Sequence, residues 1–181
     1  MLQYELRTGV VIDVLNQMES TLENPNALLA DLGEYAVQSS QERFRTSTAP
    51  DGSRWLPNSE TTYLSILGNN HTDDEGRLNN RGINRVGSKL PLVGDGTLMR
   101  DIHYQISGDL LLVGSNLIYA AAQQFGVTIK PKNAKALSWK IGGLSVFAQQ
   151  VVIPARAFLG ISIADEAEMM AIVQDHILPQ N

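Results

Sequence analysis

The strongest constraint on the fold is the run ALSWKIGGLSVFAQQVVI at positions 136–153. Two β-rich segments flank Gly142-Gly143, and both residues of this pair tolerate the positive φ angles that a two-residue hairpin turn requires. The run therefore predicts an antiparallel hairpin. Because Lys140 is its single charged residue, little protects its long edge from pairing with another chain. We expect a neighbouring subunit or a partner to cover the hairpin, and Leu144 is a candidate contact residue.

Helical patterns precede this region. Apolar residues from Val11 to Leu22 recur at helical spacing, and Asn24-Pro25 is typical of the start of a second helix. The second helix should end near Thr46, before a turn at 50–52, and its apolar stripe leaves Arg43 largely outside. The N-terminal part is therefore predicted to be mainly helical.

A last helix is predicted from Ser162, its N-cap, to about Ile177, with Asp165 and Glu166 in the first turn. Further predicted elements are strands at 2–7, 102–106 and 110–113, and a short helix, capped by Ser115 or Asn116, that ends before Gly126. The order of elements predicts an α+β fold. In it, an antiparallel β-sheet with hairpins packs against N-terminal helices and a C-terminal helix.

Residues 65–96 are rich in asparagine, glycine and charge and show no sustained period, so we expect a long loop that is mobile at least in part. With 181 residues, of which 43% are hydrophobic, the chain is predicted to form one domain over 1–181. No apolar run approaches the roughly 18–20 residues that cross a bilayer, and MLQYELRTGV lacks the pattern of a secretory signal. Since the chain has no cysteine, we expect a reducing cytoplasm.

Charge is distributed unevenly. Residues 110–164 contain no Asp or Glu and carry a net charge of +5, whereas the remainder has 9 basic and 19 acidic residues, a net charge of -10. One interpretation is a β-rich core with few charges. The other is two oppositely charged surfaces, suited to head-to-tail contact between copies. Lys130, Lys132 and Lys135 would then face an acidic neighbour, or the opening of a ring through which DNA passes. The total of -5 argues against a general nucleic-acid binder.

No catalytic pattern emerges. The histidines at 71, 103 and 176 lack metal-ligand spacing, and no G-x-S-x-G elbow is present. We expect no cofactor, no metal and no enzymatic activity. A small hydrolase that uses Asp51 and Glu60 stays open as an alternative, which would require the two carboxylates to face one bond in a cleft.

The segment IPARAFLG at 153–160 is unusual because one guanidinium stands in an apolar run. Pro154 should end the strand, and Arg156 offers five donors in a rigid fork. Arg156 either ties a loop to its own subunit or contacts a neighbouring subunit. Phe158 is expected to seal the core or to join that contact.

Trp55 allows the same two interpretations: it folds back on its own subunit, or it anchors an interface, where tryptophan is enriched. Tyr119 and Phe125 are expected in the core beside the short helix. The candidate residues for assembly are Trp55, Lys130, Lys132, Lys135, Leu144, Arg156 and Phe158.

Four stretches together carry a resemblance: PDGSRW at 50–55, GSNLIYAAAQQFG at 114–126, the Gly-Gly hairpin, and IPARAFLGIS at 153–162. In this order and at these spacings, the chain resembles the phage virion morphogenesis family, the tail completion proteins of Mu-like and related contractile-tailed phages. The resemblance covers nearly the whole chain, and the IPAR-type motif followed by FLG is its most specific part. Two positions depart from the family pattern: Gln123 stands where histidine is usual, and Ala157 where a second proline is usual.

The resemblance implies a structural virion assembly protein of a phage or prophage, a terminator-like component that completes the tail at the head–tail junction. It also implies a homo-oligomeric ring, with a hexamer as the family-level expectation, and tail-tube or head-connector proteins as partners. Such a protein would be found in the host cytoplasm during assembly and afterwards in the virion. A head-side connector or adaptor is the alternative within the same class.

Overall fold

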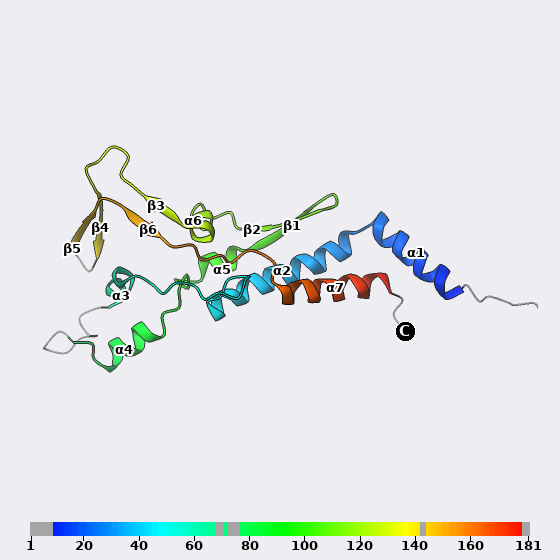
Figure 1. The fold of residues 1–181 in the computed structure, drawn as a ribbon, viewed down its shortest axis with the longest axis horizontal. Helices are drawn as coiled ribbons and strands as arrows, with labels where there is room; N and C mark the ends of the chain where they lie inside the picture. The colour runs from blue at the N-terminus through cyan, green and yellow to red at the C-terminus, as the bar shows by residue number, and fades with distance from the viewer. Residues whose placement is uncertain (1–8, 68–70, 72–76, 142–143, 179–181) are drawn as a thin grey trace, which may run out of the picture. The chain divides into compact units, whose positions relative to one another are not determined.

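The structure is a computed structural model that describes residues 9–67, 71, 77–141 and 144–178. These residues contain seven helices and three pairs of antiparallel strands (Figure 1). The helices are α1 (Gly9–Glu23), α2 (Asn26–Thr46), α3 (Glu60–Ile66), α4 (Asn80–Gly87), α5 (Thr97–Asp101), α6 (Ala120–Phe125) and α7 (Ile163–Ile177). The strands are β1 (His103–Ser107), β2 (Leu110–Gly114), β3 (Val127–Ile129), β4 (Leu137–Ile141), β5 (Leu144–Ala148) and β6 (Val151–Ile153). The predicted α+β class is confirmed, although the strands pair as β1–β2, β3–β6 and β4–β5 rather than in one sheet.

The chain divides into two compact units, each assembled from separate stretches of sequence. Unit 1 comprises residues 1–39, 103–114 and 161–181, and unit 2 comprises residues 40–102 and 115–160. α2 begins in unit 1 and ends in unit 2, so the two ends of this helix have different surroundings. The organisation of 1–181 as a single domain stays a prediction.

In unit 1, α7 runs alongside the first part of α2, and its last turn contacts α1 (Figure 1). Gln17 Nε2 and Thr21 Oγ1 of α1 both donate to the backbone carbonyl of His176, at 3.1 and 3.3 Å. The His176 ring lies 2.7 Å from the carboxylate of Asp31 on α2. Among the described residues of unit 1, no apolar side chain is fully buried, so polar contacts do much of the joining.

The start of α7 is fixed by a capping box. Ser162 Oγ accepts a hydrogen bond from Asp165 N, and Asp165 Oδ2 accepts from Ser162 N and Ser162 Oγ. The other carboxylate oxygen accepts from Tyr35 Oη and Ser39 Oγ of α2, which leaves Asp165 only 5% exposed. Burial by itself raises the pKa of Asp165. The hydrogen bonds from Ser162, Ser39 and Tyr35 together lower it by a larger amount, so that the pKa is about 2. The predicted cap and helix are confirmed.

The β1–β2 hairpin lies close to α2 because position 33 has no side chain. A Cβ atom at Gly33 would stand 2.6 Å from the ring of Tyr104 on β1, far inside van der Waals contact. The glycine therefore allows an aromatic ring of the hairpin to pack directly on the helix backbone. The predicted strands at 102–106 and 110–113 are confirmed, each to within one residue.

Unit 2 holds every apolar side chain that is fully buried in the described residues. They are Phe44, Trp55, Leu98, Ile102, Ala120 and Phe158. Two of the six, Leu98 and Ile102, lie in or directly after α5, and Ala120 begins α6. Phe44, at the end of α2, is completely buried. This small core is the part of the molecule that positions the site described below.

The strands of unit 2 form one interrupted hairpin, residues 127–153, which we call the hairpin arm. β3 pairs with β6 from Val127↔Ile153 to Ile129↔Val151, and β4 pairs with β5 from Leu137↔Ala148 to Ile141↔Leu144. Between the two ladders, residues 130–136 on one side stand opposite only 149–150 on the other. The predicted hairpin is confirmed, while the dihedral angles of the Gly-Gly turn belong to residues outside the described part.

Some predicted elements need correction. Residues 65–96 are not a loop throughout, because Asn79 Oδ1 caps α4 by accepting from Gly82 N, 3.0 Å away. The short helix α6 is preceded by Tyr119 without any side-chain cap, so neither Ser115 nor Asn116 is its N-cap. Ser115 Oγ instead accepts from Leu117 N and donates to Asp101. The predicted strand at 2–7 lies outside the described residues.

Tyr119 and Phe125 are not core residues. Tyr119 is 41% exposed and Phe125 is 77% exposed. The side chain of α6 that is buried is Ala120, and the following Gly126 has a φ of 71° that brings its backbone against that of Ala155. Backbone contact, rather than aromatic packing, therefore holds this short helix against the segment after β6.

Candidate functional site

The segment 153–160 leaves β6 and runs through unit 2 without regular structure, held by backbone and side-chain hydrogen bonds to α6. Arg156 N donates to Gln123 O at 2.7 Å. Gln124 then uses its whole amide group: Oε1 accepts from Phe158 N and Leu159 N, at 2.9 and 3.0 Å, and Nε2 donates to Leu159 O at 2.9 Å. One glutamine side chain thus replaces the strand partner that this segment lacks.

The Arg156 guanidinium reaches the loop that carries Trp55. Nε donates to Leu56 O at 2.9 Å, and Nη2 donates to Pro57 O at 2.8 Å. The side chain is only 7% exposed. Burial lowers the pKa of the guanidinium below its ordinary value, and Tyr63 raises it by a smaller amount. Of the two readings of Arg156, contact within its own chain is what the geometry shows, and contact with a neighbouring subunit stays a prediction.

Three aromatic rings, those of Phe44, Trp55 and Phe158, pack together in the core of unit 2. Phe44 packs edge-on against Trp55, with 5.3 Å between ring centroids and 86° between planes, and it meets Phe158 at the same distance and 52°. Trp55 Nε1 donates to Ala157 O at 3.0 Å, so the one polar atom of this ring is satisfied. Arg43 Nη1 donates to Phe158 O at 2.9 Å from a buried position. Burying each such ring contributes roughly 1.5–3 kcal/mol.

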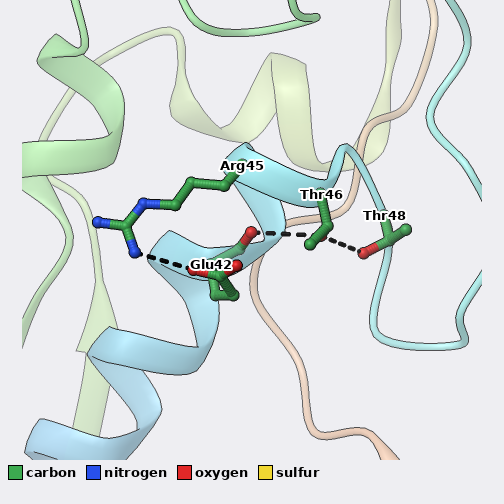
Figure 2. A network of polar contacts seen from close by, with 4 residues as sticks. All are labelled: Glu42, Arg45, Thr46 and Thr48. Atoms are coloured by element: carbon green, nitrogen blue, oxygen red, sulfur yellow. Dashed lines mark hydrogen bonds and ion pairs between the residues drawn. The ribbon is translucent and has the colours of Figure 1, made fainter.

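A second set of polar contacts lies at the C-terminal end of α2, which also carries Phe44 (Figure 2). Arg45 Nη1 lies 2.8 Å from Glu42 Oε2, and Thr46 Oγ1 lies 3.2 Å from Glu42 O and 2.7 Å from Thr48 Oγ1. After the helix, Ser47 adopts a φ of 55°, and its carbonyl accepts from Trp55 N at 2.8 Å. The chain thereby turns back so that Trp55 lies over Phe44.

The predicted site residues fall into two groups. Trp55, Arg156 and Phe158 come together in the core of unit 2, whereas Lys130, Lys132 and Lys135 are exposed on residues 130–136 of the hairpin arm. Leu144 pairs with Ile141 at the tip of the arm, and its side chain lies outside the description. Their roles in assembly stay predictions.

Arg43 and Gln124 also belong to the site, although neither was predicted from the sequence. Arg43 lies off the apolar stripe of its helix, and Gln124 is an ordinary polar residue of a short helix. Neither position carries a sequence signal, because each is defined by a backbone segment more than thirty residues away.

An open cavity of about 420 Å³ lies beside Arg156 and is also lined by Lys89, Leu98, Tyr119 and Gln123. Both of its cations are engaged, because Lys89 Nζ donates to Val93 O and Arg156 donates to the loop carbonyls. Gln123 Oε1 is buried without a hydrogen-bond donor among the described residues. The cavity therefore offers little unused positive charge to an anionic ligand.

The carboxylates that a hydrolase would need are apart from any enclosed site. Asp51 and Glu60 are both exposed to solvent. Hydrogen bonds from Ser53 lower the pKa of Asp51, as expected for a carboxylate that stabilises a turn. This arrangement contradicts the paired-carboxylate hypothesis. Among the described residues, no group of three or more His, Cys, Asp or Glu side chains has the geometry of a metal site, and no helix is long and apolar enough to cross a membrane.

Comparison with known proteins gives two matches. The profile of the phage virion morphogenesis family matches residues 7–178. The Mu-like prophage FluMu G protein 2 of Haemophilus influenzae is 33% identical over 92 residues, which is 51% of this chain and 55% of the relative. The chain thus spans about half the length of this relative. No solved structure matches the chain. The family profile covers both units and the whole of the site described above.

Proposed function

Because the chain belongs to the phage virion morphogenesis family, we propose that it is a structural protein that completes the tail at the head–tail junction of a phage or prophage particle. The resemblance inferred from the four sequence stretches is confirmed at the level of the family. The proposal goes further than the family name, since it gives the protein a place in the particle and a step in assembly.

The observation that supports a structural role is the use of the most specific motif. The guanidinium and the backbone N–H of Arg156 donate to backbone carbonyls of its own chain, and Phe158 is completely buried. The motif therefore joins four chain segments into a fixed base: the end of α2, the Trp55 loop, α6 and the segment after β6. A fixed base of this kind suits a protein whose task is to present surfaces to other proteins.

The proposed assembly is a homo-oligomeric ring, with six copies as the family-level expectation. Its partners would be tail-tube proteins on one side and head-connector proteins on the other, and DNA would pass through the opening. Light scattering and negative-stain imaging of the purified chain across concentrations test the ring. Closed rings of uniform diameter are expected, and a monomer at every concentration would contradict it.

The place in the particle is tested by mixing extracts from the phage or prophage that encodes the chain. Tails prepared without this protein should fail to join wild-type heads until the purified chain is added, whereas heads prepared without it should join wild-type tails. Infectious titre and electron microscopy are the readouts. The reverse pattern would assign the protein to the head side, as a connector or adaptor. Normal particles in its absence would contradict both positions.

A further inference from the structure

The apolar stripe of α1 faces away from the rest of unit 1. Val11, Leu15, Met18 and Leu22, which we call the α1 stripe, recur on one side of the helix and are 37–81% exposed. The side of α1 that contacts α7 carries instead the polar Gln17 and Thr21, which donate to the His176 carbonyl. An apolar side that is exposed, on a helix whose polar side contacts its own unit, is typical of a surface that binds another protein surface.

The charges on α1 indicate what kind of surface covers it. The helix carries three acidic residues, Asp13, Glu19 and Glu23, and no Lys or Arg. On an ideal helix of 3.6 residues per turn, Glu19 and Glu23 border one edge of the α1 stripe. A complementary surface therefore needs exposed apolar side chains with positive charges at its border.

The hairpin arm has this composition. On its outer faces, Phe147 is 68% exposed and Val152 is 62% exposed. Lys140 shares the face of Phe147, since Ser138 pairs with Phe147 and Lys140 pairs with Ser145. Lys130, Lys132 and Lys135 are exposed on residues 130–136, and no acidic residue occurs anywhere in 110–164. The arm thus exposes apolar side chains, and its charged residues are all lysines.

The two units as wholes also carry net charges of opposite sign. Unit 1 contains eleven acidic residues and one basic residue, a net charge of -10, whereas unit 2 contains eight acidic and thirteen basic residues, a net charge of +5. These values add up to the -5 of the chain. Two copies thus attract when unit 1 of one approaches unit 2 of the other, and repel when like units meet.

We propose that the α1 stripe of one copy docks on the hairpin arm of a second copy, with Glu19 and Glu23 of α1 facing the lysines of the arm. The contact is head-to-tail, so each copy uses both surfaces, and repeated contacts close into a ring when the rotation between copies permits it. This inference rests on the proposed function, because it specifies the contact between copies from which that ring is built.

Charge reversal tests the contact. In the arm variant, Lys130, Lys132 and Lys135 are changed to Glu; in the α1 variant, Glu19 and Glu23 are changed to Lys. Each variant alone should raise the dissociation constant between copies at least about tenfold, measured by analytical ultracentrifugation of the full chain. An equimolar mixture of the two should associate again, because each opposite pair is then restored between unlike copies.

The control for net charge reverses three exposed arginines of unit 2 that lie outside the arm: Arg54, Arg81 and Arg85. This variant should associate like the wild-type chain. Equal weakening in the control would overturn the proposal, as would unchanged association in the arm and α1 variants. A chain that carries both sets of substitutions is compared with the mixture. If this chain associates like the wild type while the mixture stays dissociated, α1 docks on the arm of its own chain, and this result would also overturn the proposal.

The apolar part is tested by Leu15→Ser with Leu22→Ser, and Met170→Ser on the exposed side of α7 is the control. The double variant should lose association at least about tenfold and keep its circular dichroism spectrum and melting temperature, because both side chains are exposed in the single chain. A lower melting temperature with unchanged association would show that the chain covers the stripe itself, and would refute the docking. If the ring forms and none of these substitutions weakens it, the proposed docking of α1 on the arm is wrong, but the proposed function is not affected. The extract-mixing experiment tests that function independently.

Discussion

Arg156 holds two consecutive carbonyl groups with two different nitrogens of one planar group. This needs a donor set of fixed geometry, because Leu56 O and Pro57 O point from adjacent peptide units. A lysine has donors on a single atom at the end of a flexible stem and cannot reproduce the pair. The residue is therefore specific to arginine even though no carboxylate or phosphate lies in the contact.

Arg156→Lys should lower the free energy of unfolding by about 1–3 kcal/mol, since at least one buried carbonyl loses its partner. Urea titration followed by the fluorescence of the chain, which contains Trp55, measures the change. Arg54→Lys, at an exposed position of the same unit, is the matched control and should change stability by less than about 0.5 kcal/mol. Equal stability of the two variants would show that Arg156 acts outside its own chain.

Asp165 makes the stability of unit 1 depend on pH. Its folded pKa of about 2 lies below the value of about 3.9 for an unfolded chain, so the ionised carboxylate stabilises the fold above that value. The contribution is lost as the pH falls from about 4 through 2. Asp165→Asn should therefore cost roughly 2–3 kcal/mol at neutral pH, and the cost should shrink on acidification.

Denaturant titrations of both chains between pH 2 and pH 7 check this prediction. Glu166→Gln is the control, because this neighbour is exposed and interacts only with the helix dipole, which is worth at most about 1 kcal/mol. A difference between wild type and Asp165→Asn that stays constant over the whole range would contradict the role of the ionised carboxylate.

At the scale of elements, the helices and hairpins were predictable because their signals are local. The Ser162 cap, the turn after Thr46 and the apolar runs around Gly142-Gly143 each act within a few residues. α4 was missed because its sequence, NRGINRVG, has two glycines and only two apolar side chains, Ile83 and Val86, which are too few to show a sustained period, and because its start depends on the Asn79 cap. Tyr119 and Phe125 were misplaced because aromatic residues beside a short helix suggest burial, whereas the chain buries Ala120 there.

The candidate site was predictable only in part. The segment 153–160, Trp55 and Arg156 stand out as sequence because their residue types are rare in such surroundings. Their partners do not, since Gln124 and Arg43 are selected by carbonyl and amide groups that fold back from distant positions. Long-range backbone partners leave no periodic trace in a single sequence, and which carbonyl an arginine binds is decided by the tertiary fold.

The hairpin arm offers a prediction of its own. Phe147→Lys should reduce association between copies by about tenfold or more without unfolding the chain, because Phe147 is 68% exposed and lies on the outer face of β5. Leu144→Lys at the tip is expected to act in the same direction. Light scattering measures the oligomer mass, and Ile118→Lys, at a side chain that is 99% exposed outside the arm, is the control. An unchanged mass in the Phe147 variant would contradict the covered hairpin.

Residues 65–96 should contain the first point of cleavage by a protease. The composition of 65–96 offers little apolar surface to offset the roughly 1–2 kcal/mol per residue that ordering a backbone costs. Limited proteolysis of the free chain, followed by mass spectrometry, should give one N-terminal and one C-terminal fragment that meet within these residues. First cuts inside 98–125 or 136–160 would contradict this organisation.

At the scale of the whole molecule, the opposite charges of the two units predict a salt dependence. If unlike units meet between copies, raising the ionic strength from about 0.05 to 0.5 M should weaken association, because exposed charges are screened beyond about 8 Å at physiological salt. Sedimentation at several salt concentrations measures it. Stronger association in salt would show that apolar contacts dominate and that the charges mainly oppose one another.

The alternation of the two units along the chain has a consequence for synthesis. Unit 1 needs α7, and unit 2 needs the segment that ends at Gly160, so neither has all its parts before residue 160 has been added. At about 5–20 residues per second, both units stay incomplete for several seconds or more while the ribosome reaches this point. Termination before residue 160 leaves Phe44 and Trp55 without Phe158, and such products lack the base on which the hairpin arm stands. Synthesis must therefore pass Gly160 before the hairpin arm has this base, and a chain that stops earlier cannot form the proposed contact between copies.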